Sequence, residues 1–188
     1  VYFDDDVFNM DKKHVLNICN EIIRRGIKIP WAAMARADLM DKDMLAVMAG
    51  AGLYAIKYGV ESANQQIIDF CRKNMDLKKT RETIELTKNT GIKVHLTFSI
   101  GLLGGTKETI EETVRFIQDA QPDSFQLSLA TPFPGTAYFR YIKQKGELLS
   151  EVWSDYDGNR KCIVKTQDLT GQNLEDIRSE ISNYFNTR

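Results

Sequence analysis

The chain has 188 residues, a formal net charge of −1, 43% hydrophobic residues and 27% charged residues. This length is enough for one sizeable core, and the near-neutral charge excludes a strong electrostatic attraction to nucleic acid or to a membrane surface. No apolar run approaches the roughly 20 residues of a membrane-spanning helix, and the three widely spaced cysteines are typical of reduced thiols. We therefore expect a cytoplasmic protein without a membrane span.

A short hydrophobic β run followed by an amphipathic helix recurs along the chain. Apolar residues at helical spacing predict a first helix over 11–25, with Asn9 or Asp11 as its cap and Gly26 beyond its end. Later helices are predicted from Asp41 to Gly50 or Gly52, across 65–90 with a break near Met75, over 106–120, and from a proline-rich turn to about Lys145. Strands are predicted at 1–3, 27–35, 53–60, 92–101 and from Asp123 to Pro132.

The alternation of strands and helices predicts parallel βαβ units and therefore an α/β fold. An open doubly wound sheet is one possibility, but no GxGxxG follows the first strand. We favour an incomplete (β/α) barrel of about five parallel strands, a partial TIM-type barrel, because polar or glycine residues stand at every strand's C-terminal end. We assign residues 1–145 to this barrel and 146–188 to a C-terminal extension with a hairpin and a final helix, and we expect further strands upstream of Val1.

The predicted strand ends carry carboxylates, one arginine, a Glu-Ser pair, a glycine turn and a proline-rich turn. In a parallel barrel such ends converge on one face, where this set suits a polar, zwitterionic small molecule. No strand end carries a histidine or a lysine placed for a Schiff base, which argues against a hydrolase triad or an aldolase. The cysteines, Cys19, Cys71 and Cys162, have no metal-binding spacing, and we predict no metal site in this chain.

Five motifs occur in a characteristic order, namely "FDDDVF", "ARAD", "GVES", "FSIGLLGGTKET" and "TPFPGT". Together they resemble the radical S-adenosylmethionine superfamily, in the branch that usually carries an upstream cobalamin-binding domain. Within that branch the pattern is similar to enzymes of the anaerobic magnesium-protoporphyrin IX monomethyl ester oxidative cyclase type. The resemblance covers nearly the whole chain, with Leu103 and Gly105 standing where relatives more often have a proline and an acidic residue.

The resemblance implies S-adenosylmethionine as a cofactor, together with a [4Fe–4S] cluster held by a CxxxCxxC loop after the first barrel strand and, for this branch, cobalamin. No CxxxCxxC is present in this chain. We therefore expect the cluster ligands in an upstream part of the same polypeptide, and we expect this segment alone to be inactive.

The resemblance also implies roles for individual residues. Asp4 or Asp5 would meet the methionyl amine, and the planar fork of Arg36 would meet the methionyl carboxylate. A salt bridge from Arg36 to Asp38 or Asp4 is the structural alternative. Glu61 would accept hydrogen bonds from the two ribose hydroxyls.

Ser62 would be a nearby polar contact, or alternatively a cap for the helix that begins at Asn64. Gly101 and Leu103 would border the adenosine, and Phe133 belongs to a rigid turn that would face the adenine edge. A strand-to-helix turn that needs glycine for its geometry alone, and a plain loop end, are the alternatives for these two segments. We identify no catalytic side chain.

The sequence therefore predicts part of a radical S-adenosylmethionine enzyme, of oxidoreductase, cyclase or methyltransferase type, that binds this cofactor and a small-molecule substrate at the barrel mouth. One alternative is a non-catalytic, degenerate barrel that acts as a binding module. The other is a lyase or isomerase barrel that holds a divalent metal through Asp4, Asp5, Asp6 and Glu61.

Overall fold

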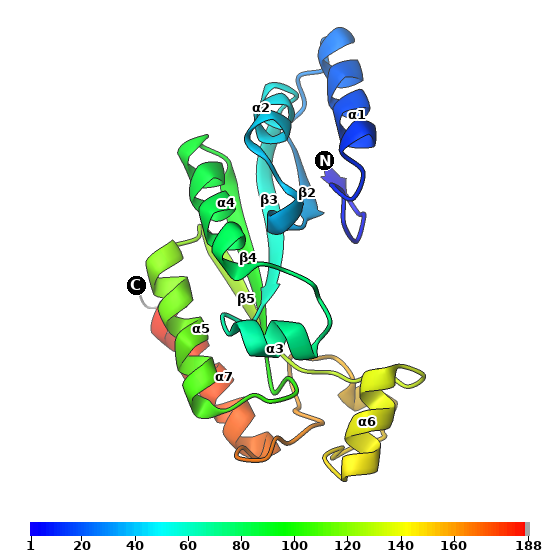
Figure 1. Ribbon diagram of the computed structural model, residues 1–188, viewed down its shortest axis with the longest axis vertical. Coiled ribbons are helices and arrows are strands. Elements are labelled where there is room, and N and C mark those ends of the chain that lie inside the picture. The colour runs from blue at the N-terminus through cyan, green and yellow to red at the C-terminus, as the bar shows by residue number, and fades with distance from the viewer. Residues whose placement is uncertain (187–188) are drawn as a thin grey trace. The chain divides into compact units, whose positions relative to one another are not determined.

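The computed structural model describes residues 1–186 and divides them into two compact units, which are described separately (Figure 1). The first unit comprises residues 1–60, 75–97 and 117–126, and the second comprises 61–74, 98–116 and the described residues from 127 onward. The predicted α/β class is confirmed, because five parallel strands form one sheet in the order β1-β2-β3-β4-β5. They are β1 (Tyr2–Phe3), β2 (Trp31–Ala35), β3 (Leu53–Glu61), β4 (Lys93–Ile100) and β5 (Ser124–Leu129).

Sequential strands are neighbours throughout this sheet, as expected for part of a barrel. Residues Tyr2 and Phe3 pair with Ala32 and Ala33, and the pairing of β2 with β3 shifts register directly after Trp31. The second strand is shorter than predicted because it begins only after Pro30, which has no N–H to donate to a sheet ladder.

Helices occupy the predicted intervals between the strands. They are α1 (Lys12–Arg24), α2 (Lys42–Gly50), α3 (Gln65–Phe70), α4 (Leu77–Asn89), α5 (Lys107–Ala120), α6 (Ala137–Lys145) and α7 (Gly171–Asn186), with 3₁₀ turns η1 (Ala37–Leu39) and η2 (Trp153–Asp155). Asp11, rather than Asn9, caps α1 by accepting from the backbone N–H groups of Lys13 and His14. Asp41 caps α2 as predicted, and the break near Met75 separates α3 from α4.

In the first unit, α1 packs against α2, and η1 contacts α4. Along β4, every second side chain is buried, and Val94 and Leu96 are completely so. The phenol of Tyr58 from β3 and the hydroxyl of Thr87 from α4 lie 3.0 Å apart in this core, so neither buried polar group lacks a partner.

The second unit contains α3, α6 (yellow in Figure 1), α7 and the C-terminal ends of three strands. Arg178 of α7 donates from Nε to the carbonyl of Leu127 at 2.8 Å, which ties the last helix to the end of β5. The predicted hairpin is reduced to one antiparallel bridge between Leu148 and Val164. The proposed domain boundary after residue 145 stays a prediction. Between residues 1 and 186, no helix has both the length and the hydropathy to cross a bilayer.

Candidate functional site at the strand ends

In the first unit, hydrogen bonds within the protein hold the segment that follows β2. Asp4, Asp5 and Asp6 follow β1 as exposed residues. Asn9 then turns back to the end of β2, where its Nδ2 donates to the carbonyl of Arg36 at 2.8 Å and its Oδ1 accepts from the Arg36 N–H at 2.9 Å. This two-sided contact fixes the backbone at Arg36 and explains why Asn9 is buried.

The guanidinium of Arg36 donates two hydrogen bonds to the carboxylate of Asp38, from Nε to Oδ1 at 3.1 Å and from Nη2 to Oδ2 at 2.7 Å. Asp38 is only 8% exposed, so the pair is largely withdrawn from water. The structure thus contains the salt bridge that the sequence allowed as the alternative role of Arg36. A ligand carboxylate would have to compete with Asp38 for this fork.

Glu61 ends β3 in the second unit with an unusual backbone conformation. Its φ is +66°, in the left-handed region that costs a residue with a Cβ about 1–2 kcal/mol. Its carboxylate is partly exposed, and it accepts from Lys73 Nζ on Oε1 at 2.7 Å and from Ser99 Oγ on Oε2 at 3.2 Å. Backbone strain that surrounding contacts maintain is characteristic of binding and catalytic positions.

Lys73 was missed in the sequence because no motif marks it. It lies in the loop between α3 and α4. Its neighbours Arg72 and Asn74 have positive φ angles of 53° and 48°, as Glu61 does. The loop backbone is held by the N–H of Lys73, which donates to the carbonyl of Ile68 at 3.2 Å. The strained loop therefore supports the cation that meets Glu61.

Ser62 is buried, and its hydroxyl accepts from the backbone N–H of Asn64 at 3.2 Å. Asn64 in turn caps α3 by accepting from the N–H of Ile67. The hydroxyl of Ser62 thus serves the turn that leads into α3, which is close to the structural alternative stated for this residue.

The glycine turn after β4 is required by contacts within the protein. Gly101 has φ +80°, and a Cβ added there would lie 3.0 Å from Leu174 Cδ1 and 3.3 Å from Val164 Cγ2. At Gly105 a Cβ would lie 2.9 Å from the carbonyl oxygen of Leu102. The hydroxyl of Tyr138 donates to the Gly101 carbonyl at 3.2 Å, and burial raises the pKa of this phenol. The positive φ at Gly101 and these close contacts each disfavour a side chain at the two positions.

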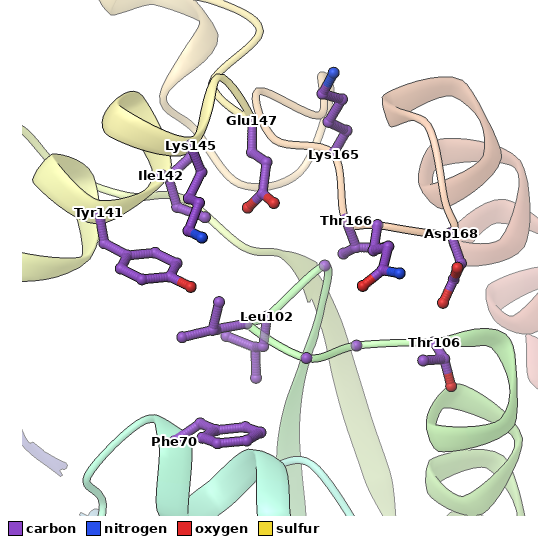
Figure 2. Close-up of a pocket in the computed structure, with 15 residues that line it drawn as sticks. Phe70, Leu102, Thr106, Tyr141, Ile142, Lys145, Glu147, Lys165, Thr166 and Asp168 are labelled. Carbon is purple, nitrogen blue, oxygen red and sulfur yellow. The ribbon is translucent and has the colours of Figure 1, made fainter.

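A pocket of about 530 Å³ opens beside this turn (Figure 2). Phe70, Leu102 and Leu103 give it apolar walls, and the end of α6 and the segment 165–168 complete it. Of the predicted cofactor residues, Gly101 and Leu103 line this pocket. Phe133 is 54% exposed and packs against Tyr156, with ring centroids 6.2 Å apart. The pocket depends on the C-terminal extension, for which the sequence suggested no ligand contacts.

The cysteines do not form an iron–sulfur site. Cys19 and Cys162 are buried and Cys71 is exposed. Burial raises the pKa of the Cys19 thiol to about 11, whereas a metal ligand must be a thiolate. Within residues 1–186, no three histidine, cysteine, aspartate or glutamate side chains gather closely enough to hold a metal ion. A [4Fe–4S] cluster, or the oxygen-ligated divalent metal of the lyase alternative, therefore does not fit this part of the chain.

Comparison with known proteins identifies relatives along the whole chain. The pattern of the radical SAM superfamily matches residues 6–117. An uncharacterized methyltransferase of Pyrococcus horikoshii is 29% identical over 94% of this chain and 38% of its own length. The anaerobic magnesium-protoporphyrin IX monomethyl ester cyclase of Cereibacter sphaeroides is 31% identical over 96% of this chain and 30% of its own length.

Solved structures share the fold. The radical S-adenosylmethionine methyltransferase TsrM of Kitasatospora setae, solved with cobalamin and a [4Fe–4S] cluster, superposes with a TM-score of 0.69. It is 19% identical, and the match covers 77% of this chain and 28% of that protein. The chain thus spans about a third of the length of these relatives. The resemblance inferred from the motifs, and its branch, are confirmed.

Proposed function

Because the chain belongs to the radical SAM superfamily, we propose that it is the part of a radical SAM enzyme that binds S-adenosylmethionine and a small-molecule substrate at the C-terminal ends of its strands. Enzymes of this superfamily use S-adenosylmethionine together with a [4Fe–4S] cluster. Since the cluster does not fit residues 1–186, its ligands would lie elsewhere in the same polypeptide, and the isolated segment would be inactive.

The single observation that carries this proposal is the carboxylate of Glu61 on a strained strand end. An ionised carboxylate has about four acceptor positions. Lys73 and Ser99 fill one position each on different oxygens, which leaves room for the two neighbouring hydroxyls of a ribose. Lys73 and Ser99 would hold the carboxylate in one orientation, so that little ordering remains when the ligand binds.

The other contacts implied by the family resemblance are proposed for each unit by itself. Asp4 or Asp5 would accept a hydrogen bond from the methionyl amine. Arg36 would release Asp38 and pair with the methionyl carboxylate instead. Gly101 and Leu103 would border the adenosine, with Phe133 toward the adenine edge. Methyl transfer or oxidative ring closure is supported by relatives that are named as methyltransferases and as a cyclase. Cobalamin, which an upstream domain would supply, is present in a solved structure that shares the fold.

Binding can be measured on the chain itself with S-adenosylhomocysteine in a calorimeter. Glu61→Gln keeps the size of the side chain but removes its charge, and we expect about tenfold weaker binding, since a charge-assisted hydrogen bond contributes about 1.5–3 kcal/mol. Glu111→Gln is the matched control, because Glu111 is an exposed helix residue with only a loose ion pair to Arg115. Equal affinities in the two variants would remove Glu61 from the site.

Activity requires the longer protein, reconstituted under anaerobic conditions. We expect formation of 5′-deoxyadenosine, and less of it when Glu61 is replaced by alanine. No 5′-deoxyadenosine from a fully loaded protein would refute the proposed function.

A further inference from the structure

Four charged residues line the pocket of the second unit, namely Lys145, Glu147, Lys165 and Asp168, and the first two do not pair with each other. Lys145 is the last residue of α6 and Glu147 follows two positions later, separated by Gly146 with φ +68°. Figure 2 shows the Lys145 amine and the Glu147 carboxylate pointing into the same space. Among residues 1–186, neither group takes part in an ion pair, whereas the neighbouring Lys143 is bonded to Glu151 at 2.6 Å.

The backbone at these charges is held in place on both sides. The N–H of Glu147 donates to the carbonyl of Ile142 at 3.0 Å, and the carbonyl of Glu147 accepts from the N–H of Lys165 at 2.9 Å. The Lys145 ammonium lies 5.7 Å from the centre of the Tyr141 ring, within the range of a cation–π contact. The two charges are therefore attached to a well-supported part of the pocket wall.

The opposite side of the pocket is apolar. Phe70 and Leu102 lie across from Lys145 in Figure 2, and Leu103 and the buried Ile142 extend this surface. A cavity of about 530 Å³ falls within the range of small-molecule sites, which combine apolar walls with a few convergent polar groups.

We propose that this pocket binds a zwitterionic α-amino acid with a large apolar or aromatic side chain. Lys145 meets the ligand carboxylate, Glu147 meets the ligand ammonium, and Phe70 with Leu102 contacts the ligand side chain. A simple anion would face the carboxylate of Glu147, and a simple cation would face Lys145. A ligand with both charges is attracted by both groups.

This pocket shares Gly101 and Leu103 with the proposed cofactor site, whereas Lys145, Glu147 and Phe70 belong to the pocket alone, and it involves neither the Glu61 carboxylate nor a cluster. Its test contains no radical chemistry, so a failed result would leave the proposed function untouched, and the reverse also holds.

The test is a titration of the ¹⁵N-labelled chain with L-phenylalanine, followed by amide chemical shifts. We expect saturable shifts at 101–106 and 145–147. Binding should be about tenfold weaker for 3-phenylpropionate, which lacks the ammonium, for 2-phenylethylamine, which lacks the carboxylate, and for glycine, which lacks the side chain.

Two variants assign the charges. Lys145→Met should reduce the affinity for L-phenylalanine to that for 2-phenylethylamine, and Glu147→Gln should reduce it to that for 3-phenylpropionate. Lys143→Met, on the same helix but paired with Glu151, should bind like the unmodified chain. Unsaturable shifts, or equal binding of all four compounds, would overturn the proposal.

Discussion

The strand ends of the two units differ in how far their charged side chains are paired and withdrawn from water. In the first unit, Arg36 is bonded to Asp38 and to Asn9, so its charge and its backbone are already satisfied. In the second unit, Glu61 keeps a strained backbone and a partly exposed carboxylate, and a pocket opens beside Gly101. The contrast separates a loop whose ion pair is withdrawn from water from a strand end whose paired carboxylate stays partly exposed.

The largest expected effect tests the closed loop of the first unit. Arg36→Met leaves Asp38 buried without its partner, and we expect a loss of about 2–4 kcal/mol in the free energy of unfolding. Lys12→Met breaks an exposed pair with Asp41 and should cost less than about 1 kcal/mol. Denaturant unfolding followed by the fluorescence of the buried Trp31 measures both. Equal costs would mean that the loop does not depend on this ion pair.

Gly101→Ala tests the turn of the second unit. Alanine there combines a left-handed backbone with contacts to Leu174 and Val164, and we expect a loss of about 2–3 kcal/mol in stability. Gly91→Ala is the matched control, because Gly91 has the same φ of +80° but nothing within 4 Å of an added Cβ. It should cost about 1–2 kcal/mol. Hydrogen exchange of the amides near each substitution measures the two losses. Equal losses in the two variants would show that Leu174 and Val164 move aside without cost.

Glu61 allows the strain itself to be measured. In an ordinary strand alanine is more stable than glycine by about 0.5–1 kcal/mol. At a φ of +66° the order should be inverted, with Glu61→Gly more stable than Glu61→Ala by about 1 kcal/mol. Both variants lose the ion pair with Lys73, so their difference isolates the backbone. If denaturant unfolding showed the alanine variant to be more stable than the glycine variant, the backbone at Glu61 would not be strained.

The smallest expected effect is the pH dependence due to His95 in the first unit. Burial, and then the positive charge of Lys57, lower the pKa of His95 below 6.5. Below pH 6.5 the unfolded chain binds a proton that the folded chain does not, so stability falls as the pH drops from 6.5 toward the folded pKa. His95→Gln should remove this slope, which unfolding curves between pH 5 and pH 7.5 would detect. An unchanged slope would assign it to another group.

Much of the fold could be predicted from the sequence because it depends on local patterns. The cap of α2 at Asp41 and the break between α3 and α4 near Met75 depend on side chains within a few positions of the helix ends. The start of β2 was placed too early because apolar residues before Pro30 continue the strand pattern although the proline interrupts the ladder.

The candidate site was harder to predict because its decisive contacts join separated segments. Lys73 reaches Glu61 across α3, and Asn9 reaches Arg36 from 27 positions away. The sequence offered Asp38 as a possible partner of Arg36, but nothing in it indicated that Lys73 and Ser99 contact Glu61.

The sequence by itself determined the succession of strands and helices, the superfamily and the positions of the polar strand ends, because hydrophobic period and short motifs are local properties. Only the tertiary structure decided which polar groups neutralise one another and which line a cavity. Side-chain pairing depends on distances between residues far apart in the chain, and the pocket requires four separate parts of the chain to come together, namely Phe70, 101–106, 141–147 and 165–168.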